Sequence, residues 1–104
     1  MPKKHRDYET DLLERLKDPE YAAGYLNAVL EDTDIDIKER FLLALRDVAK
    51  AHGMSQFAIQ ASIAREAMYR ALSEEGNPQL DTLLAILHAS GLTLSINVRK
   101  KRKA

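Results

Sequence analysis

The chain has 104 residues, 45% hydrophobic and 31% charged, which is typical of one globular domain with a short tail. It has no run of about 18 apolar residues and no apolar segment after its charged N-terminus, so we expect neither a membrane span nor a secretory signal. The absence of cysteine excludes disulfides and thiolate metal sites and fits a cytoplasmic protein.

The 16 basic and 16 acidic residues are distributed unevenly along the chain. Residues 1–52 carry 9 Lys/Arg and 12 Asp/Glu, a net charge of −3, and residues 53–104 carry 7 and 4, a net charge of +3. Residues 18–37 contain six acids and no Lys or Arg, whereas residues 99–103 are all basic. Such asymmetry allows different partners at the two ends, although charged runs are commonly only solvated surface.

Two helices are predicted before residue 32. An apolar stripe of Leu12, Leu13 and Leu16 predicts the first. The second begins at Pro19, because Asp18 can accept an orphan amide proton and proline fits the first helical position. The strongest amphipathic pattern follows, over residues 36–51, and predicts a third helix.

Residues 55–72 have the pattern of two short helices joined by a tight turn. Small and apolar residues are spaced to share a core, and a mostly polar set, with one alanine, falls on the opposite side of the second helix: Arg65, Glu66, Ala67, Tyr69 and Arg70. This is the pattern of a helix-turn-helix, whose second helix faces the DNA major groove. An ordinary helical hairpin would show the same spacing.

The C-terminal part begins with a turn at residues 74–79, followed by an apolar stripe that predicts a helix from Leu80 to near Gly91. Apolar and polar residues then alternate over residues 92–98, which predicts a half-buried β-strand. Because one strand cannot satisfy its own backbone groups, this strand needs a partner.

Over roughly residues 19–98 the chain resembles the antidote (antitoxin) proteins of bacterial toxin–antitoxin modules that carry a Cro/repressor-like helix-turn-helix. The resemblance rests on PEYAAGYLNAVLED, FLLALRDVAKAHGMSQ, AREAMYRALSEEGNPQLDTLLAIL and GLTLSI. It implies an all-α fold, a five-helix helix-turn-helix bundle with an N-terminal helical extension and a short C-terminal β-strand. We therefore divide the chain into an N-terminal helical extension over 1–35, which is the candidate toxin-binding part, a helix-turn-helix DNA-binding domain with the C-terminal strand over 36–98, and a basic tail over 99–104.

Two positions depart from the family pattern. Ser62 stands between the motif helices, where the family usually has glycine in a left-handed backbone conformation. Ala64 stands where a serine-type cap usually precedes the recognition helix. We therefore expect either mild strain at Ser62 or a different turn, and an uncapped second helix.

The resemblance implies a DNA-binding surface, for which the candidate residues are Ser55, Gln56, Arg65, Glu66, Ala67, Tyr69, Arg70, Arg99, Lys100 and Lys101. Arg65 and Arg70 lead this set as candidates for base or phosphate contact, and arginine can bond both acceptors on a guanine edge. Glu66 can accept from cytosine or simply pair with Arg70 on the helix surface. Residues 53–98 are not basic overall, so strong DNA attraction requires the basic tail, dimerisation or Lys50.

By resemblance, the protein is an antitoxin that neutralises an RNA-cleaving toxin and, as a transcriptional repressor, binds its own operator DNA. The alternative is a protein-interaction module that binds the toxin without specific DNA binding. The candidate toxin-binding residues combine acidic charge with apolar anchors: Tyr21, Tyr25, Leu26 and Glu31. The tyrosines are equally compatible with packing of their helix onto the core.

We also expect a homodimer, with residues 92–98 contributing to the contact, because a helix-turn-helix normally reads two half-sites through a two-fold dimer. Alternatively, this strand edge pairs with a toxin strand or with N-terminal residues of the same chain. No enzyme activity, cofactor or metal is expected, since His5, His52 and His88 lack metal-ligand spacing.

Overall fold

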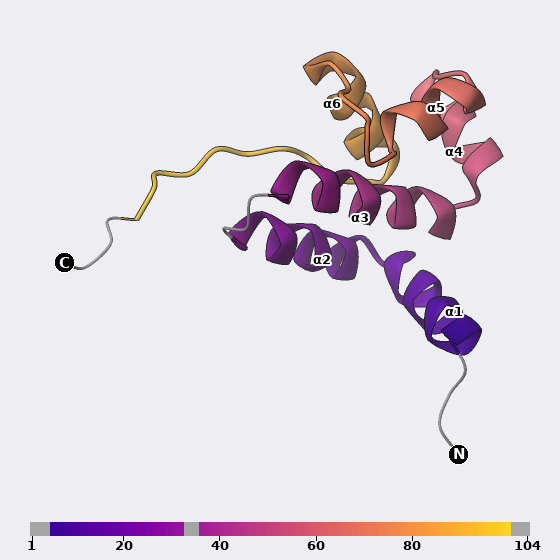
Figure 1. Cartoon of the computed structure of the whole chain (residues 1–104), viewed down its shortest axis with the longest axis horizontal. Helices are drawn as coiled ribbons and strands as arrows, with labels where there is room; N and C mark the ends of the chain where they lie inside the picture. Colours follow the sequence, from indigo (N-terminus) through magenta and orange to yellow (C-terminus); the bar gives the residue numbers. More distant parts are fainter. Residues whose placement is uncertain (1–4, 33–35, 101–104) are drawn as a thin grey trace.

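The structure, a computed structural model, describes residues 5–32 and 36–100 and is all-α within them (Figure 1). Its helices are α1 (His5–Leu16), α2 (Pro19–Glu31), α3 (Ile37–Ala51), α4 (Met54–Ala61), α5 (Arg65–Ala71) and α6 (Leu80–Ala89). No helix in the described ranges is long and apolar enough to cross a membrane.

The prediction of an all-α fold is confirmed, but two of its details are wrong. Four helices, α3 to α6, follow the N-terminal pair in the described chain, where the sequence predicted a bundle of five. Residues 92–100 form neither helix nor strand. Leu92, Thr93 and Leu94 lie against α2 and the start of α3, and the residues after them project away from the helices (Figure 1). The alternating pattern there favours extended backbone, but no described segment lies alongside to complete a β-ladder, and Ile96 and Val98 are 95% and 94% exposed.

Helix α3 is the centre of the hydrophobic core. Six small and branched apolar residues of this helix are buried: Leu42, Ala44, Leu45, Val48, Ala49 and Ala51. Figure 1 shows α1 and α2 on one side of α3 and α4, α5 and α6 on the other. This arrangement gives the molecule two distinct surfaces, one on each side of α3.

The N-terminal helices are part of this core. Leu16 of α1 is 0% exposed, and Ala22 and Leu26 of α2 join the same cluster of buried residues as α3. The predicted start of α2 is confirmed, since the Asp18 side chain accepts from the Glu20 amide at 3.1 Å and Pro19 occupies the first turn.

Candidate functional site

Helices α4 and α5, with the turn between them, form the α4–α5 unit, Met54–Ala71. Ser62 ends α4 with φ 58° and ψ 41°, a left-handed conformation, and it is the one described non-glycine residue with positive φ. The next amide, that of Ile63, donates to the Ala58 carbonyl at 3.0 Å. The turn therefore takes the backbone geometry that usually calls for glycine, with serine in that place.

Helix α5 has no side-chain cap, because Ala64 occupies the capping position. The helix packs on the core through Met68 and Leu72, which are both fully buried. The loop that follows passes close behind it: Gly76 is buried, and a Cβ there would meet the backbone carbonyl of Ala71. Packing on one face and a tight loop thus position α5 in the absence of a cap.

The opposite face of α5 is open to solvent. Arg65, Glu66 and Arg70 are exposed, and Ala67 and Tyr69 are half-buried. Ser55 and Gln56, at the start of α4, are also exposed. The predicted DNA-binding residues of the α4–α5 unit therefore lie on accessible surface.

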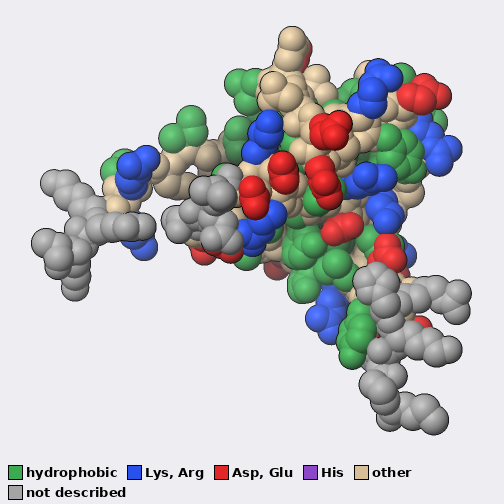
Figure 2. All heavy atoms as spheres, in the orientation of Figure 1, with side chains coloured by type: hydrophobic (Ala, Val, Ile, Leu, Met, Phe, Trp, Pro, Cys, Tyr) green, Lys and Arg blue, Asp and Glu red, His purple; other side chains and the backbone are tan. Residues whose placement is uncertain are grey.

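Sequence reasoning missed one cation of this surface. The guanidinium carbon of Arg46, in α3, lies 5.2 Å from the centre of the Tyr69 ring, and that of Arg65 lies 5.7 Å from the same centre. Both distances fall within the range of about 6 Å for cation–π attraction. Figure 2 shows Lys and Arg side chains gathered over α5 and the adjoining end of α3. No local sequence pattern connects Arg46 with Tyr69, because their contact is made by tertiary packing.

The basic C-terminal residues are placed differently. Arg99 and Lys100 are exposed at the end of the projecting segment, which leaves the molecule on the side away from α5 (Figure 1). Lys101 lies outside the described residues. The structure thus places Arg99 and Lys100 away from the exposed face of α5 in the same chain.

The candidate toxin-binding residues of α2 divide into two groups. Leu26 is 4% exposed, and the half-buried Tyr25 donates its hydroxyl to a carboxylate oxygen of Asp47 in α3 at 3.0 Å. Burial, reinforced by the adjacent Asp47 carboxylate, raises the pKa of Tyr25 to about 12. Tyr21, which is 39% exposed, and Glu31 remain on the surface.

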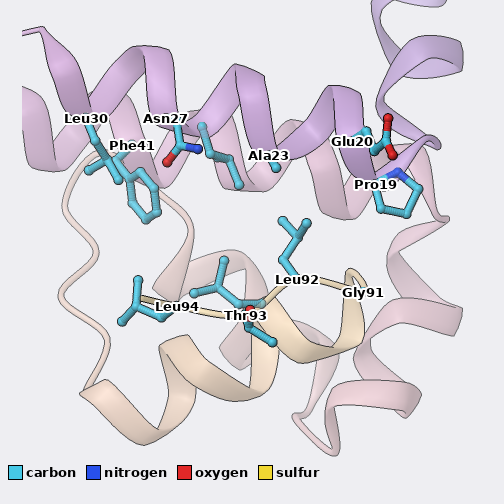
Figure 3. Close-up of a pocket in the computed structure, with 12 residues that line it drawn as sticks. Pro19, Glu20, Ala23, Asn27, Leu30, Phe41, Gly91, Leu92, Thr93 and Leu94 are labelled. Atoms are coloured by element: carbon cyan, nitrogen blue, oxygen red, sulfur yellow. The ribbon is translucent and has the colours of Figure 1, made fainter. Parts of the chain in front are cut away.

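A cavity of about 330 Å³ lies between α2, the start of α3 and the segment after α6 (Figure 3). Glu20 and Pro19 stand at one end and Leu30 and Phe41 at the other, with Leu92 pointing toward α2. Glu20 is the one ionisable side chain among the described residues that line it. Within residues 5–32 and 36–100, no group of His, Cys, Asp and Glu is arranged to hold a metal ion.

These features define a small all-α protein with an arginine-bearing exposed helix on one side of α3 and acidic α2 on the other. Residues 7–98 match the family model described as "probable addiction module antidote protein", and the chain belongs to that family. An uncharacterised protein of Haemophilus influenzae is 39% identical over 94 residues, which cover 90% of this chain and 92% of that protein. No solved structure gave a significant match. The family confirms the resemblance seen in the sequence and indicates an antitoxin with a cognate toxin as partner.

Proposed function

We propose that this protein is a cytoplasmic antitoxin that neutralises an RNA-cleaving toxin and represses transcription by binding its own operator DNA. The observation that carries the DNA-binding part is the two-faced character of α5. Met68 is buried in the core, while Arg65 and Arg70 are exposed on the opposite side. A short helix held in this way can present its polar face to the major groove.

The proposed DNA-binding and toxin-binding surfaces lie on opposite sides of α3. Residues 36–98 contain the DNA-binding surface, and residues 1–35 supply the toxin-binding surface through the exposed Tyr21 and Glu31 of α2. Because α2 and α5 lie on opposite sides of α3 (Figure 1), a toxin bound to α2 leaves α5 accessible to DNA. Negative charge on α2 favours association with a toxin that holds RNA through positive charge.

The DNA-binding form is a homodimer, and residues 92–98 contribute to its contact. The support for this contact is the exposed apolar surface of the projecting segment, in which Leu94, Ile96 and Val98 are all exposed. Its backbone also lies in the open, and pairing with a second copy would satisfy both the apolar side chains and the backbone groups.

A second candidate function is toxin binding without specific DNA recognition. It is favoured by the exposed acids Glu66, Glu74 and Glu75 on and after α5, which oppose phosphate binding. Under this alternative, α4 and α5 serve only the hydrophobic core, and substitutions on the exposed face of α5 have no effect on function.

A gel-shift assay with the DNA upstream of the protein's own gene separates the two functions. Arg65→Ala and Arg70→Ala should each weaken operator binding by about 1–3 kcal/mol. Arg15→Ala is the matched control, since Arg15 is an exposed arginine on α1, across α3 from α5. If the wild type binds the operator and neither α5 substitution weakens that binding, the proposed role of α5 in DNA recognition is refuted. A toxin complex without any operator shift would favour the alternative.

A further inference from the structure

The most unusual charged cluster in the described chain surrounds the ring of Tyr69. Arg46 reaches it from α3 and Arg65 from the start of α5, at 5.2 Å and 5.7 Å from the ring centre. The cluster joins two helices that are separated in sequence by α4 and both turns. We call these three residues the Arg–Tyr–Arg cluster.

The two arginines lack the partners that other cations of the protein have. Lys17, Arg40 and Lys50 each lie within 3.0 Å of a carboxylate oxygen. In residues 5–32 and 36–100, no carboxylate forms an ion pair with Arg46 or Arg65. Two positive charges are therefore held around one aromatic ring, and neither is in salt-bridge contact with a carboxylate of the described chain.

This arrangement suits an external anion. Stacking on the ring restricts the flexible arginine side chains before any ligand arrives, so less conformational entropy is lost on binding. An anion beside both guanidinium groups relieves their mutual repulsion and accepts charge-assisted hydrogen bonds. A phosphodiester is the anion that the rest of this surface would meet, because Arg65 and Tyr69 of the cluster belong to α5, the helix proposed to face DNA.

We propose that the Arg–Tyr–Arg cluster binds a phosphate of the DNA backbone, which adds Arg46 of α3 to the DNA-binding surface. This inference rests on the proposed operator binding and deepens it. Arg46 and Arg65 position the protein on the duplex through phosphate, and Arg70, outside the cluster, is left to contact base edges.

The loop after α5 bears on the same site. Arg46 lines a shallow hollow together with Ser73, Glu74 and Glu75, and Glu75 also lines the neighbouring hollow that contains Arg70. These two carboxylates lower the electrostatic potential that an approaching phosphate meets. Removing their charge should therefore strengthen binding to DNA of any sequence.

The test uses the full chain and fluorescence anisotropy with two labelled duplexes of equal length, the DNA upstream of its gene and an unrelated sequence, over a range of salt concentrations. Arg46→Ala should weaken binding to both duplexes about tenfold, and the slope of log affinity against log salt should flatten by about 0.9. Arg70→Ala should weaken binding mainly to the upstream DNA.

Three further variants complete the test. Arg46→Lys keeps the charge but loses the planar stack, so it should bind between the wild type and Arg46→Ala. The doubly neutralised Glu74→Gln, Glu75→Gln chain should bind both duplexes more tightly. Arg15→Ala should match the wild type in binding, and urea unfolding should show that Arg46→Ala is folded, with at most the small loss of stability expected from one cation–π contact.

The outcomes distinguish the two proposals. An unchanged salt slope for Arg46→Ala, with operator binding by the wild type intact, overturns the phosphate site and leaves the proposed function standing. Loss of affinity by Arg46→Ala for the upstream DNA alone also overturns it, because phosphate contacts are blind to sequence. No binding of the wild type to either duplex overturns both the phosphate site and the operator-binding part of the proposed function.

Discussion

Replacing Ser62 with glycine tests the backbone geometry of the turn that orients α5. Ser62 has φ 58° and ψ 41°, a conformation that costs an L-residue roughly 1–2 kcal/mol and glycine almost nothing. Its side chain is exposed, and its hydroxyl makes no hydrogen bond among the described residues, so little is lost by removing it. Glycine also makes the unfolded chain more flexible, at about 0.4–1 kcal/mol.

The balance of these terms predicts that Ser62→Gly raises the free energy of unfolding by about 0.5–1 kcal/mol. Urea unfolding followed by circular dichroism measures this directly, and the melting temperature should rise by roughly 2–6 °C. Ser62→Ala is the control, because alanine also lacks the hydroxyl but keeps the Cβ that causes the strain. A glycine variant no more stable than the alanine variant would refute the strain at this turn.

Four other substitutions test separate parts of the structure. Tyr25→Phe removes the hydrogen bond to Asp47 and should lower the unfolding free energy by about 1–2 kcal/mol near neutral pH. Because the folded-state pKa of Tyr25 is raised from 10.0 to about 12, this stabilisation is complete below pH 10 and is lost as the pH rises toward 12. Urea unfolding at each pH should show that loss in the wild type and not in the phenylalanine variant. Gly76→Ala should lower the unfolding free energy by about 1–3 kcal/mol in the same assay, since the new Cβ meets the Ala71 carbonyl. Gly24→Ala should raise the unfolding free energy by about 0.5–1 kcal/mol, because Gly24 lies in α2 with open space around it. Ile96→Pro removes a backbone donor from the projecting segment and should convert the proposed dimer to monomer in sedimentation, and a wild-type monomer at micromolar concentration would contradict the dimer itself.

Features set by local chemistry were predictable from the sequence. Asp18 and Pro19 fixed the start of α2, because an N-cap and a proline act within one helical turn. The left-handed conformation of Ser62 was one of two alternatives, since the family resemblance called for it and the residue itself disfavours it. The apolar stripes predicted the helices for the same reason, because the spacing that defines each stripe lies within a single helix.

Features set by packing between distant segments were not predictable in this way. The contact between Arg46 and Tyr69 depends on how α3 and α5 are placed relative to each other, and the sequence of either helix alone does not predict that placement. The period-two pattern of residues 92–98 describes a preference for extended backbone, but a strand also requires a partner. Likewise, the pattern around Tyr25 fits both a toxin surface and a core contact, and its hydrogen bond to Asp47 shows only that it is engaged with α3.

The central claim is that this protein is the antitoxin of an RNA-cleaving toxin. It is tested most directly by an RNA-cleavage assay of the product of the gene next to its own, with and without an equimolar amount of this protein. We predict rapid cleavage by the neighbouring protein alone and intact RNA when the two proteins are mixed first. Cleavage at the same rate in both reactions would contradict the claim.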